Sequence, residues 1–138
     1  MKVTITIDAV ETDGTDPSRS VNTLRGFLRK CDNSFELSYR EPAGEEGLGN
    51  TLTFLRIFDD KMELSRQGDY RCLLTMEVGC RHEADYDTPL GRFALTTDTD
   101  AFCTTLTPDG HGELTVSYTL YAAGSSSHHR LHITVTPA

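Results

Sequence analysis

The sequence of 138 residues contains no long hydrophobic run. No apolar segment approaches the ~20 residues that a membrane-spanning helix needs. Alternating apolar and polar residues follow Met1 directly, without the basic region and apolar stretch of a signal peptide. The sequence therefore predicts a cytoplasmic protein without a transmembrane helix.

Positive charge is also scarce in this chain. The 13 Lys and Arg residues are outnumbered by 21 Asp and Glu residues, which gives a formal net charge of −8. An acidic domain repels the phosphates of nucleic acids and the headgroups of anionic membranes. We therefore expect no nucleic-acid or membrane partner, whereas a small-molecule ligand stays possible and the oligomeric state stays open.

Cysteine is rare, and no C-x-x-C pair is present. Cys72 and Cys80 share the alternating positions of the apolar residues between them, which predicts that both face the core. In one extended strand they would lie roughly 26 Å apart, too far for a disulfide. We expect four buried free thiols that act as small hydrophobic side chains and not as metal ligands. They are Cys31, Cys72, Cys80 and Cys103.

The dominant pattern is a hydrophobic period of two. Val3, Ile5 and Ile7 alternate with polar residues, and the same alternation recurs along the whole chain. Such a period predicts β-strands with one buried and one solvent-facing side. Turn formers such as Asp13-Gly14 and Pro108-Asp109-Gly110 separate the segments. The predicted strands are residues 2–9, 19–30, 35–41, 51–57, 61–67, 70–78, 81–88, 92–97, 102–107, 113–122 and 129–136.

This pattern predicts one all-β domain over residues 1–138, a closed antiparallel up-and-down β-barrel of about 8–10 strands. An antiparallel meander needs an even number of strands to close, whereas the segments number eleven. Two segments should therefore be one bent strand. Gly79, which interrupts an apolar alternation, is the candidate for the bend.

Several short motifs resemble those of the YwiB-like family of small bacterial proteins. They are Tyr39-Arg40-Glu41, Arg66-Gln67-Gly68, and the ordered set Met76, Gly79, Tyr86, Thr88-Pro89 and Gly91. The resemblance implies a calycin-type, lipocalin-like barrel in a bacterial cytosol. It implies no activity, because the family carries a domain of unknown function. The chain has no Trp for the lipocalin Gly-x-Trp signature, and residues 10–20 are too short and polar for the lid of the fatty-acid-binding proteins.

Polar residues at inward positions form the candidate site. Arg66 shares the inward side of its strand with the apolar residues before it, as do Tyr39 and Glu41 in theirs. These two strands run parallel in a meander with one strand between them, so Glu41 and Arg66 should lie near the same end of the barrel. Tyr70, at the start of the next strand, should lie there too.

An inward guanidinium must be paired or solvated, because an isolated buried charge is very costly. Glu41 is the expected partner of Arg66, and Tyr39 or Tyr70 could contribute a hydroxyl. One interpretation is a structural ion pair that closes one end of the barrel. The other is an anchor for a small acidic ligand, since guanidinium binds carboxylate and phosphate well.

His82 would also face inward if no bulge intervenes, and an inward histidine suggests a general base. An enzyme would use His82 or Tyr86 with Arg66 and Glu41. No Ser or Cys nucleophile stands in a recognisable motif nearby, so a simple structural histidine is the favoured interpretation and an enzyme is the least favoured function.

The sequence predicts neither a metal site nor a cofactor. His128 and His132 would lie about 13 Å apart along a strand, and His128 and His129 would point to opposite faces. Asp98-Thr99-Asp100 lacks the Gly and the distant Glu of a calcium loop and is interpreted as a turn.

Two functions are weighed. The favoured one is a barrel that holds a small, acidic or amphipathic ligand at Tyr39, Glu41, Arg66, Tyr70, His82 and Tyr86. The alternative is a protein-interaction or structural module, with contacts through acidic loops at Glu45-Glu46 and residues 83–87. Its core would be filled by large inward side chains such as Phe27, Phe35, Phe54, Met76, Phe93 and Tyr118.

Overall fold

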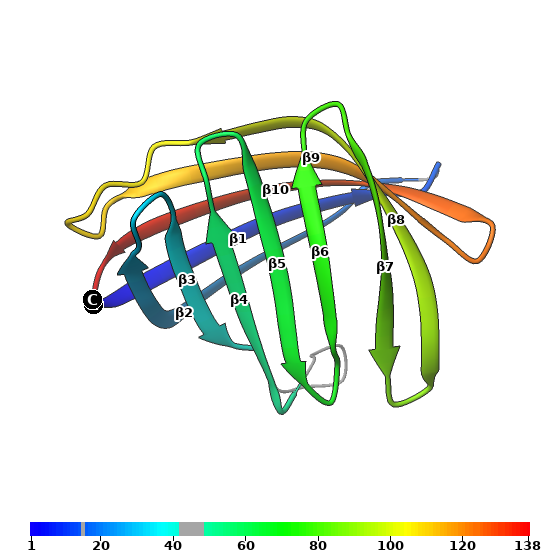
Figure 1. Cartoon of the computed structure of the whole chain (residues 1–138), viewed down its shortest axis with the longest axis horizontal. Helices are drawn as coiled ribbons and strands as arrows, with labels where there is room; N and C mark the ends of the chain where they lie inside the picture. Colours follow the sequence, from blue (N-terminus) through cyan, green and yellow to red (C-terminus); the bar gives the residue numbers. More distant parts are fainter. Residues whose placement is uncertain (15, 42–48) are drawn as a thin grey trace.

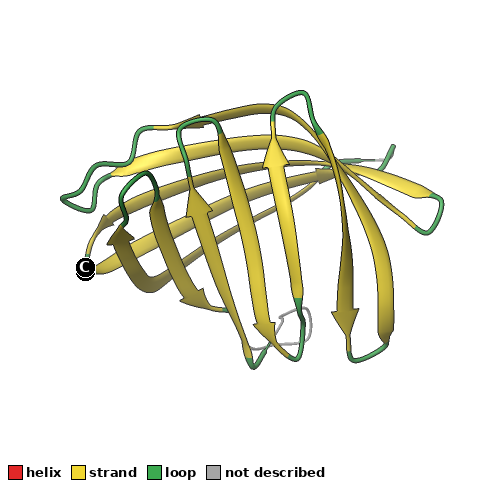
Figure 2. Cartoon of the chain, in the orientation of Figure 1, coloured by secondary structure: helices red, strands yellow, loops and turns green. Residues whose placement is uncertain are grey.

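The computed structural model of the chain describes residues 1–14, 16–41 and 49–138. These residues form ten β-strands and no helix (Figure 2). The strands are β1 (Lys2–Thr12), β2 (Ser18–Lys30), β3 (Phe35–Arg40), β4 (Thr51–Ile57), β5 (Lys61–Gly68), β6 (Cys72–Glu77), β7 (Arg81–Thr88), β8 (Gly91–Thr104), β9 (Gly112–Ala122) and β10 (Ser125–Pro137). In the ranges described, no helix is long and apolar enough to cross a membrane.

All ten strands belong to one antiparallel sheet with the order β6-β5-β4-β3-β2-β1-β10-β9-β8-β7. The first and last strands are neighbours in the middle of this order, so β1 pairs with both β2 and β10. The two end strands, β6 and β7, follow one another in the chain. The sheet therefore curls into an up-and-down barrel whose seam lies between them, and β4 to β7 cross in front of the long strands β1, β9 and β10 (Figure 1). This confirms the predicted fold.

The seam is not a continuous ladder. Arg71 and Asp87 exchange backbone hydrogen bonds of 2.9 and 2.8 Å at one end, and Gly79 N donates to Thr99 O at 3.1 Å at the other. Between them, the Thr97 hydroxyl of β8 donates to the Thr75 carbonyl of β6 at 2.8 Å. The barrel is therefore nearly closed, with side-chain contacts where a full ladder would supply backbone bonds.

The bend in β2 depends on a glycine. Residues of β2 up to Phe27 pair with β1, whereas Phe27 to Lys30 pair with β3. The strand therefore bends as it leaves its pairing with β1. A Cβ at Gly26 would collide with the Ser38 carbonyl oxygen and lie 2.6 Å from Cδ1 of Ile5. The missing side chain thus allows the close approach of three strands at this corner.

One half of the barrel interior is solid and the other half is hollow. Along β1 the inward side chains change from fully buried Val3 and Ile5 to partly buried Ile7 and Ala9. The solid half holds most of the fully buried apolar side chains: Val3, Ile5, Leu37, Ile57, Met62, Met76, Leu114, Val116 and Val135. Leu55 and Ile133 are also fully buried, but they line the cavity of the hollow half. Packing in the solid half fixes the strands that carry the polar residues of the other half.

The position of the bent strand was predicted wrongly. Residues 92–97 and 102–107 belong largely to one strand, β8, whose register with β9 shifts between Thr99 and Ala101. Asp100 is the extra residue of a β-bulge, so the predicted turn at residues 98–100 is extended chain. Gly79, in contrast, has φ +77° in the turn that separates β6 from β7.

The predicted burial of the cysteines also needs correction. All four thiols are free, but Cys80 and Cys103 are exposed, and Cys31 and Cys72 are only half-buried. The turn at Gly79 ends the alternation on which the inward assignment of Cys80 was based. The bulge at Asp100 likewise interrupts the alternation before Cys103.

Candidate functional site

The hollow half of the barrel contains a cavity of about 350 Å³. Most of its lining is aliphatic, from side chains such as Ile7, Leu120 and Leu131. Ser20 and Asn22 of β2 also line it and are exposed, so the cavity meets solvent on their side. Its ionisable lining residues are Tyr39, Glu41, Arg66, Tyr86, Tyr118 and His129.

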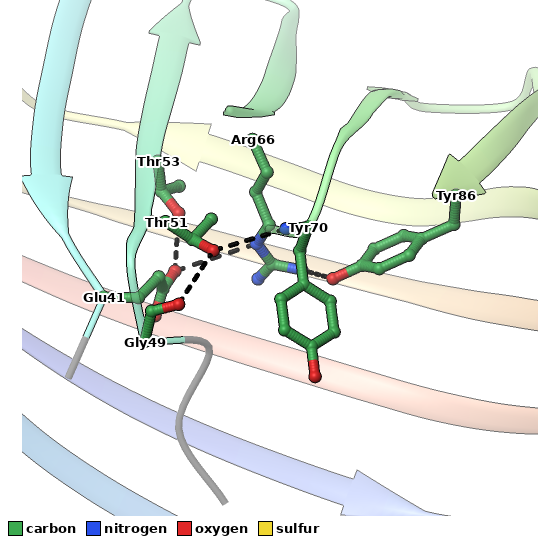
Figure 3. A network of polar contacts seen from close by, with 7 residues as sticks. All are labelled: Glu41, Gly49, Thr51, Thr53, Arg66, Tyr70 and Tyr86. Carbon is green, nitrogen blue, oxygen red and sulfur yellow. Dashed lines mark hydrogen bonds and ion pairs between the residues drawn. The ribbon is translucent and has the colours of Figure 1, made fainter. Parts of the chain in front are cut away.

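The centre of the polar group is the ion pair of Glu41 and Arg66. Glu41 follows the last residue of β3, Arg66 lies near the end of β5, and Thr53 of β4 lies between them. Arg66 Nε is 3.7 Å from Glu41 Oε1, and the two side chains are only 22% and 13% exposed. The Thr53 hydroxyl donates a 2.5 Å hydrogen bond to the same carboxylate oxygen. The structure therefore contains the predicted inward pair (Figure 3).

Tyr86 binds the other side of the guanidinium. Arg66 Nη1 donates a 2.8 Å hydrogen bond to the Tyr86 hydroxyl, which connects β5 with β7. Tyr70 packs edge-on against Tyr86, with ring centroids 6.1 Å apart, and its hydroxyl points away from Arg66 (Figure 3). The predicted hydroxyl partner, Tyr39 or Tyr70, is thus replaced by Tyr86, while Tyr70 supports the Tyr86 ring.

One donor of the guanidinium is unused. Arg66 Nε is buried and has no hydrogen-bond partner among the residues that the structure describes. Its 3.7 Å separation from Glu41 Oε1 is too long for a hydrogen bond. Buried polar atoms in native proteins nearly always have a partner, so this donor is an exception that requires an explanation.

The tyrosines that surround the pair are neutral at physiological pH. Burial, with a further contribution from Glu41, raises the pKa of Tyr39 well above its usual value. Burial likewise raises the pKa of Tyr118 to about 12. Both side chains are therefore protonated phenols, which add no charge to the pair of Glu41 and Arg66.

Sequence analysis missed a role for His129 in the cavity. The imidazole stacks on the Tyr118 ring at a centroid distance of 5.1 Å, and its Nε2 lies 2.7 Å from the Ser127 hydroxyl. Burial lowers the pKa of His129 below its usual value, so the ring is predominantly neutral near neutral pH. The sequence pattern that could have predicted this position is the alternation of His129 with Leu131 and Ile133, which places all three side chains on the inner side of β10.

His82 does not lie in this group, contrary to expectation. It is half-exposed, its Nε2 is 3.1 Å from Glu77 Oε1, and it does not line the cavity. His82 lies on the same side of β7 as Ala84 and Tyr86 and pairs with buried Thr97, but it is at the opposite end of the strand from Tyr86, next to the turn at Gly79. Of the two candidate enzyme groups, the one with His82 is therefore not assembled in the described chain, whereas Tyr86 does lie with Arg66 and Glu41.

Several large side chains expected to fill the barrel do not do so. Phe27 is 57% exposed and Phe93 is 44% exposed, whereas Phe54 lies on the outer side of β4, opposite Leu55. Gly26 and Leu28 occupy the inward positions of β2, which turns Phe27 outward. Only Met76, Tyr118 and, in part, Phe35 pack in the core as expected, so half of the interior stays hollow.

The fold and the site define a ten-stranded antiparallel barrel with a partly polar interior cavity. The chain belongs to the family of the domain of unknown function DUF1934, whose model matches residues 3–133. The crystal structure of the ywiB protein from Bacillus subtilis is similar, with a TM-score of 0.88 over 99% of this chain and 92% of that chain. The two chains are 20% identical, so this likeness shows the barrel fold alone. The resemblance to the YwiB-like family is confirmed. No curated protein matches the chain.

Proposed function

We propose that the barrel interior binds one small ligand with a carboxylate or similar anionic group and an apolar body. Arg66 holds the anionic group, and Tyr86 fixes the guanidinium plane. The aliphatic wall that includes Ile7, Leu120 and Leu131 contacts the rest of the ligand. The protein is then a small-molecule binding barrel and has no need of a cofactor for this activity.

Two facts carry the proposal: Arg66 lines the cavity, and its buried Nε has no hydrogen-bond partner in the described part of the chain. An unsatisfied buried donor costs about 1–3 kcal/mol, and more for a charged group. A ligand oxygen bound at Nε removes this cost, and a carboxylate forms the strong charge-assisted type of hydrogen bond. The neutral phenols nearby place no further negative charge against such a ligand.

The size of the cavity limits the ligand. A volume of about 350 Å³ is near the lower end of the roughly 300–1,000 Å³ range of small-molecule sites. The exposed Ser20 and Asn22 mark the side from which a ligand enters. A medium-chain carboxylic acid satisfies the size, the apolar wall and the single cationic anchor together.

The alternative interaction module has less support. Its filled core depended on large inward residues such as Phe27 and Phe93, which are largely exposed. The proposed contact loop at Glu45-Glu46 lies outside the described residues.

The test compares octanoate with 1-octanol by isothermal titration calorimetry. The two molecules share the apolar chain and differ in the anionic group. We expect octanoate to bind with one-to-one stoichiometry and at least about tenfold more tightly than octanol, because only octanoate forms a hydrogen bond in which both the donor and the acceptor are charged. Arg66→Lys, which keeps the charge, should reduce this preference, whereas Arg29→Lys on the outer surface should leave it unchanged. Equal binding of both molecules, or of neither, would contradict the proposal.

A further inference from the structure

Three side chains of the types that bind metal ions lie together at the turn between β6 and β7. Glu77 is the last residue of β6, Cys80 lies in the turn and His82 is the second residue of β7. Gly79 adopts φ +77°, and Cys80 N donates a 3.0 Å hydrogen bond to Glu77 O, which closes the turn. This local geometry brings a carboxylate oxygen, a thiol sulfur and an imidazole nitrogen within 4.8 Å of one another.

The three side chains already interact. His82 Nε2 lies 3.1 Å from Glu77 Oε1, and this hydrogen bond is the main reason that the pKa of Glu77 lies below its usual value. Burial and the neighbouring Glu77 carboxylate raise the pKa of the Cys80 thiol. The three side chains therefore already face one another, and their ligand atoms lie within 4.8 Å without an ion.

We propose that Glu77, Cys80 and His82 bind one zinc ion, with water at the fourth position. Sulfur, imidazole nitrogen and carboxylate oxygen are the three ligand types that Zn²⁺ takes in proteins. Zinc bonds of about 2.0–2.3 Å place the ligands of one ion roughly 3–4 Å apart. Small rotations of these half-exposed or exposed side chains bring the three atoms into that range. On binding, the Cys80 thiol releases its proton to solvent and the sulfur forms the bond to zinc.

The surroundings leave room for the ion. Lys61 is the cross-strand neighbour of Glu77, but its ammonium lies over the Phe58 ring, 5.2 Å from the centroid. Arg81 points to Asp98, with a 3.0 Å ion pair. The nearest cations therefore have partners of their own, and the ligand group is accessible from solvent.

The proposed zinc site lies at the seam and is independent of the cavity. The backbone contacts of the seam lie at Arg71–Asp87 and at Gly79–Thr99. The three proposed zinc ligands lie at the end of the seam marked by Gly79–Thr99. An ion shared by Glu77 and His82 links the end of β6 to the start of β7. Zinc should therefore raise the melting temperature of the barrel, since it binds the folded state in preference to the unfolded state.

The experiment titrates the reduced, metal-free full chain with Zn²⁺ against a chromophoric chelator, and with Co²⁺ as a spectroscopic probe. We expect one equivalent of Zn²⁺ per chain and a sulfur-to-cobalt charge-transfer band. Cys80→Ser should abolish the band. Both Cys80→Ser and His82→Gln should weaken zinc binding by at least about tenfold, because even the loss of a residue that only supports a metal ligand typically weakens binding by that factor.

Cys103→Ser is the matched control, because Cys103 is also exposed and lies on a different strand. It should keep the band, the stoichiometry and the melting shift of the unchanged protein. Far-ultraviolet circular dichroism verifies that each variant folds. The absence of one-to-one binding would overturn the proposal, as would binding that persists in Cys80→Ser and His82→Gln or is lost equally in Cys103→Ser.

Discussion

Arg66 and Tyr86 join two strands that share no backbone ladder. The 2.8 Å hydrogen bond from Arg66 Nη1 to the Tyr86 hydroxyl runs from β5 to β7, past the seam at β6. The same guanidinium is 3.7 Å from the carboxylate of Glu41, which directly follows β3. One side chain therefore helps to close the barrel and lines its cavity, with a buried Nε that has no hydrogen-bond partner among the described residues, so the structural and ligand-anchor interpretations of Arg66 are compatible.

Replacement of Arg66 should strongly destabilise the barrel. Arg66→Met removes the cation that pairs with the Glu41 carboxylate, and the Glu41 side chain is only 13% exposed to solvent. Breaking a buried ion pair in this way costs on the order of 3 kcal/mol or more of unfolding free energy. Urea unfolding measures the loss. Arg29→Met is the control, because Arg29 is 68% exposed in its pair with Glu36 and should lose at most about 1 kcal/mol. Equal small losses in both variants would contradict the inward pair.

Loss of the carboxylate should strengthen ligand binding. Glu41→Gln keeps a hydrogen-bond acceptor near Thr53 but removes the negative charge that competes for Arg66. We expect octanoate affinity to rise by about tenfold or more, because a hydrogen bond to a charged group contributes about 1.5–3 kcal/mol and about 1.4 kcal/mol is a factor of ten. Calorimetric titration measures the change. Glu36→Gln, on the outer surface of β3, should leave the affinity unchanged, and an equal or weaker affinity in Glu41→Gln would count against Arg66 as the anchor.

The Tyr86 hydroxyl should contribute measurably to closure of the seam. Tyr86→Phe keeps the ring that packs on Tyr70 and removes only the acceptor of the Arg66 hydrogen bond. A hydrogen bond to a charged group contributes about 1.5–3 kcal/mol, so we expect a loss near the lower value. Hydrogen exchange of β6 and β7 amides should accelerate as well. Tyr121→Phe, on a half-exposed tyrosine of β9, is the control and should change neither quantity.

The neutral His129 should make stability depend on pH. Because burial lowers the pKa of His129 in the folded state, the unfolded state binds the proton more readily. The free energy of unfolding is therefore highest, as far as His129 is concerned, above the ordinary pKa of 6.5, where the imidazole is neutral in both states. It decreases as the pH falls through 6.5 toward the lower pKa of the folded state. Denaturation at a series of pH values should therefore show a smaller loss of stability below pH 6.5 in His129→Gln than in the unchanged protein. His128→Gln, on the opposite face, should retain the full pH dependence.

Much of the fold could be predicted because strand side chains alternate strictly between two faces. The alternation at Val3, Ile5 and Ile7 recurs in all parts of the chain, and turn formers delimit nearly every strand. The prediction failed where a single residue changes the alternation. The bulge at Asp100 resembles a polar turn in sequence, and the left-handed turn at Gly79 resembles a bulge. Local sequence does not distinguish these cases, because the pairing partner on another strand decides between them.

The polar site was predictable in part for the same reason. Inward alternation and the meander order were enough to bring Glu41 next to Arg66. Tyr86 as the hydrogen-bond partner of Arg66 was not predictable, since that contact depends on how the sheet curls to bring β7 near β5. An interior with room for a ligand agrees with the favoured interpretation, whereas the inward placement of Phe27 was wrong, because alternation along β2 places Gly26 and Leu28 inward and Phe27 outward.

The most direct test of the account observes the Arg66 Nε–H group itself. In isotope-labelled protein its nuclear magnetic resonance signal can be assigned as the one that disappears in Arg66→Lys. The account predicts that octanoate shifts this signal in a saturable manner and slows its exchange with solvent, whereas 1-octanol leaves it in place. A signal that stays unchanged while octanoate binds elsewhere, or that responds equally to octanol, would contradict a ligand anchor at Arg66.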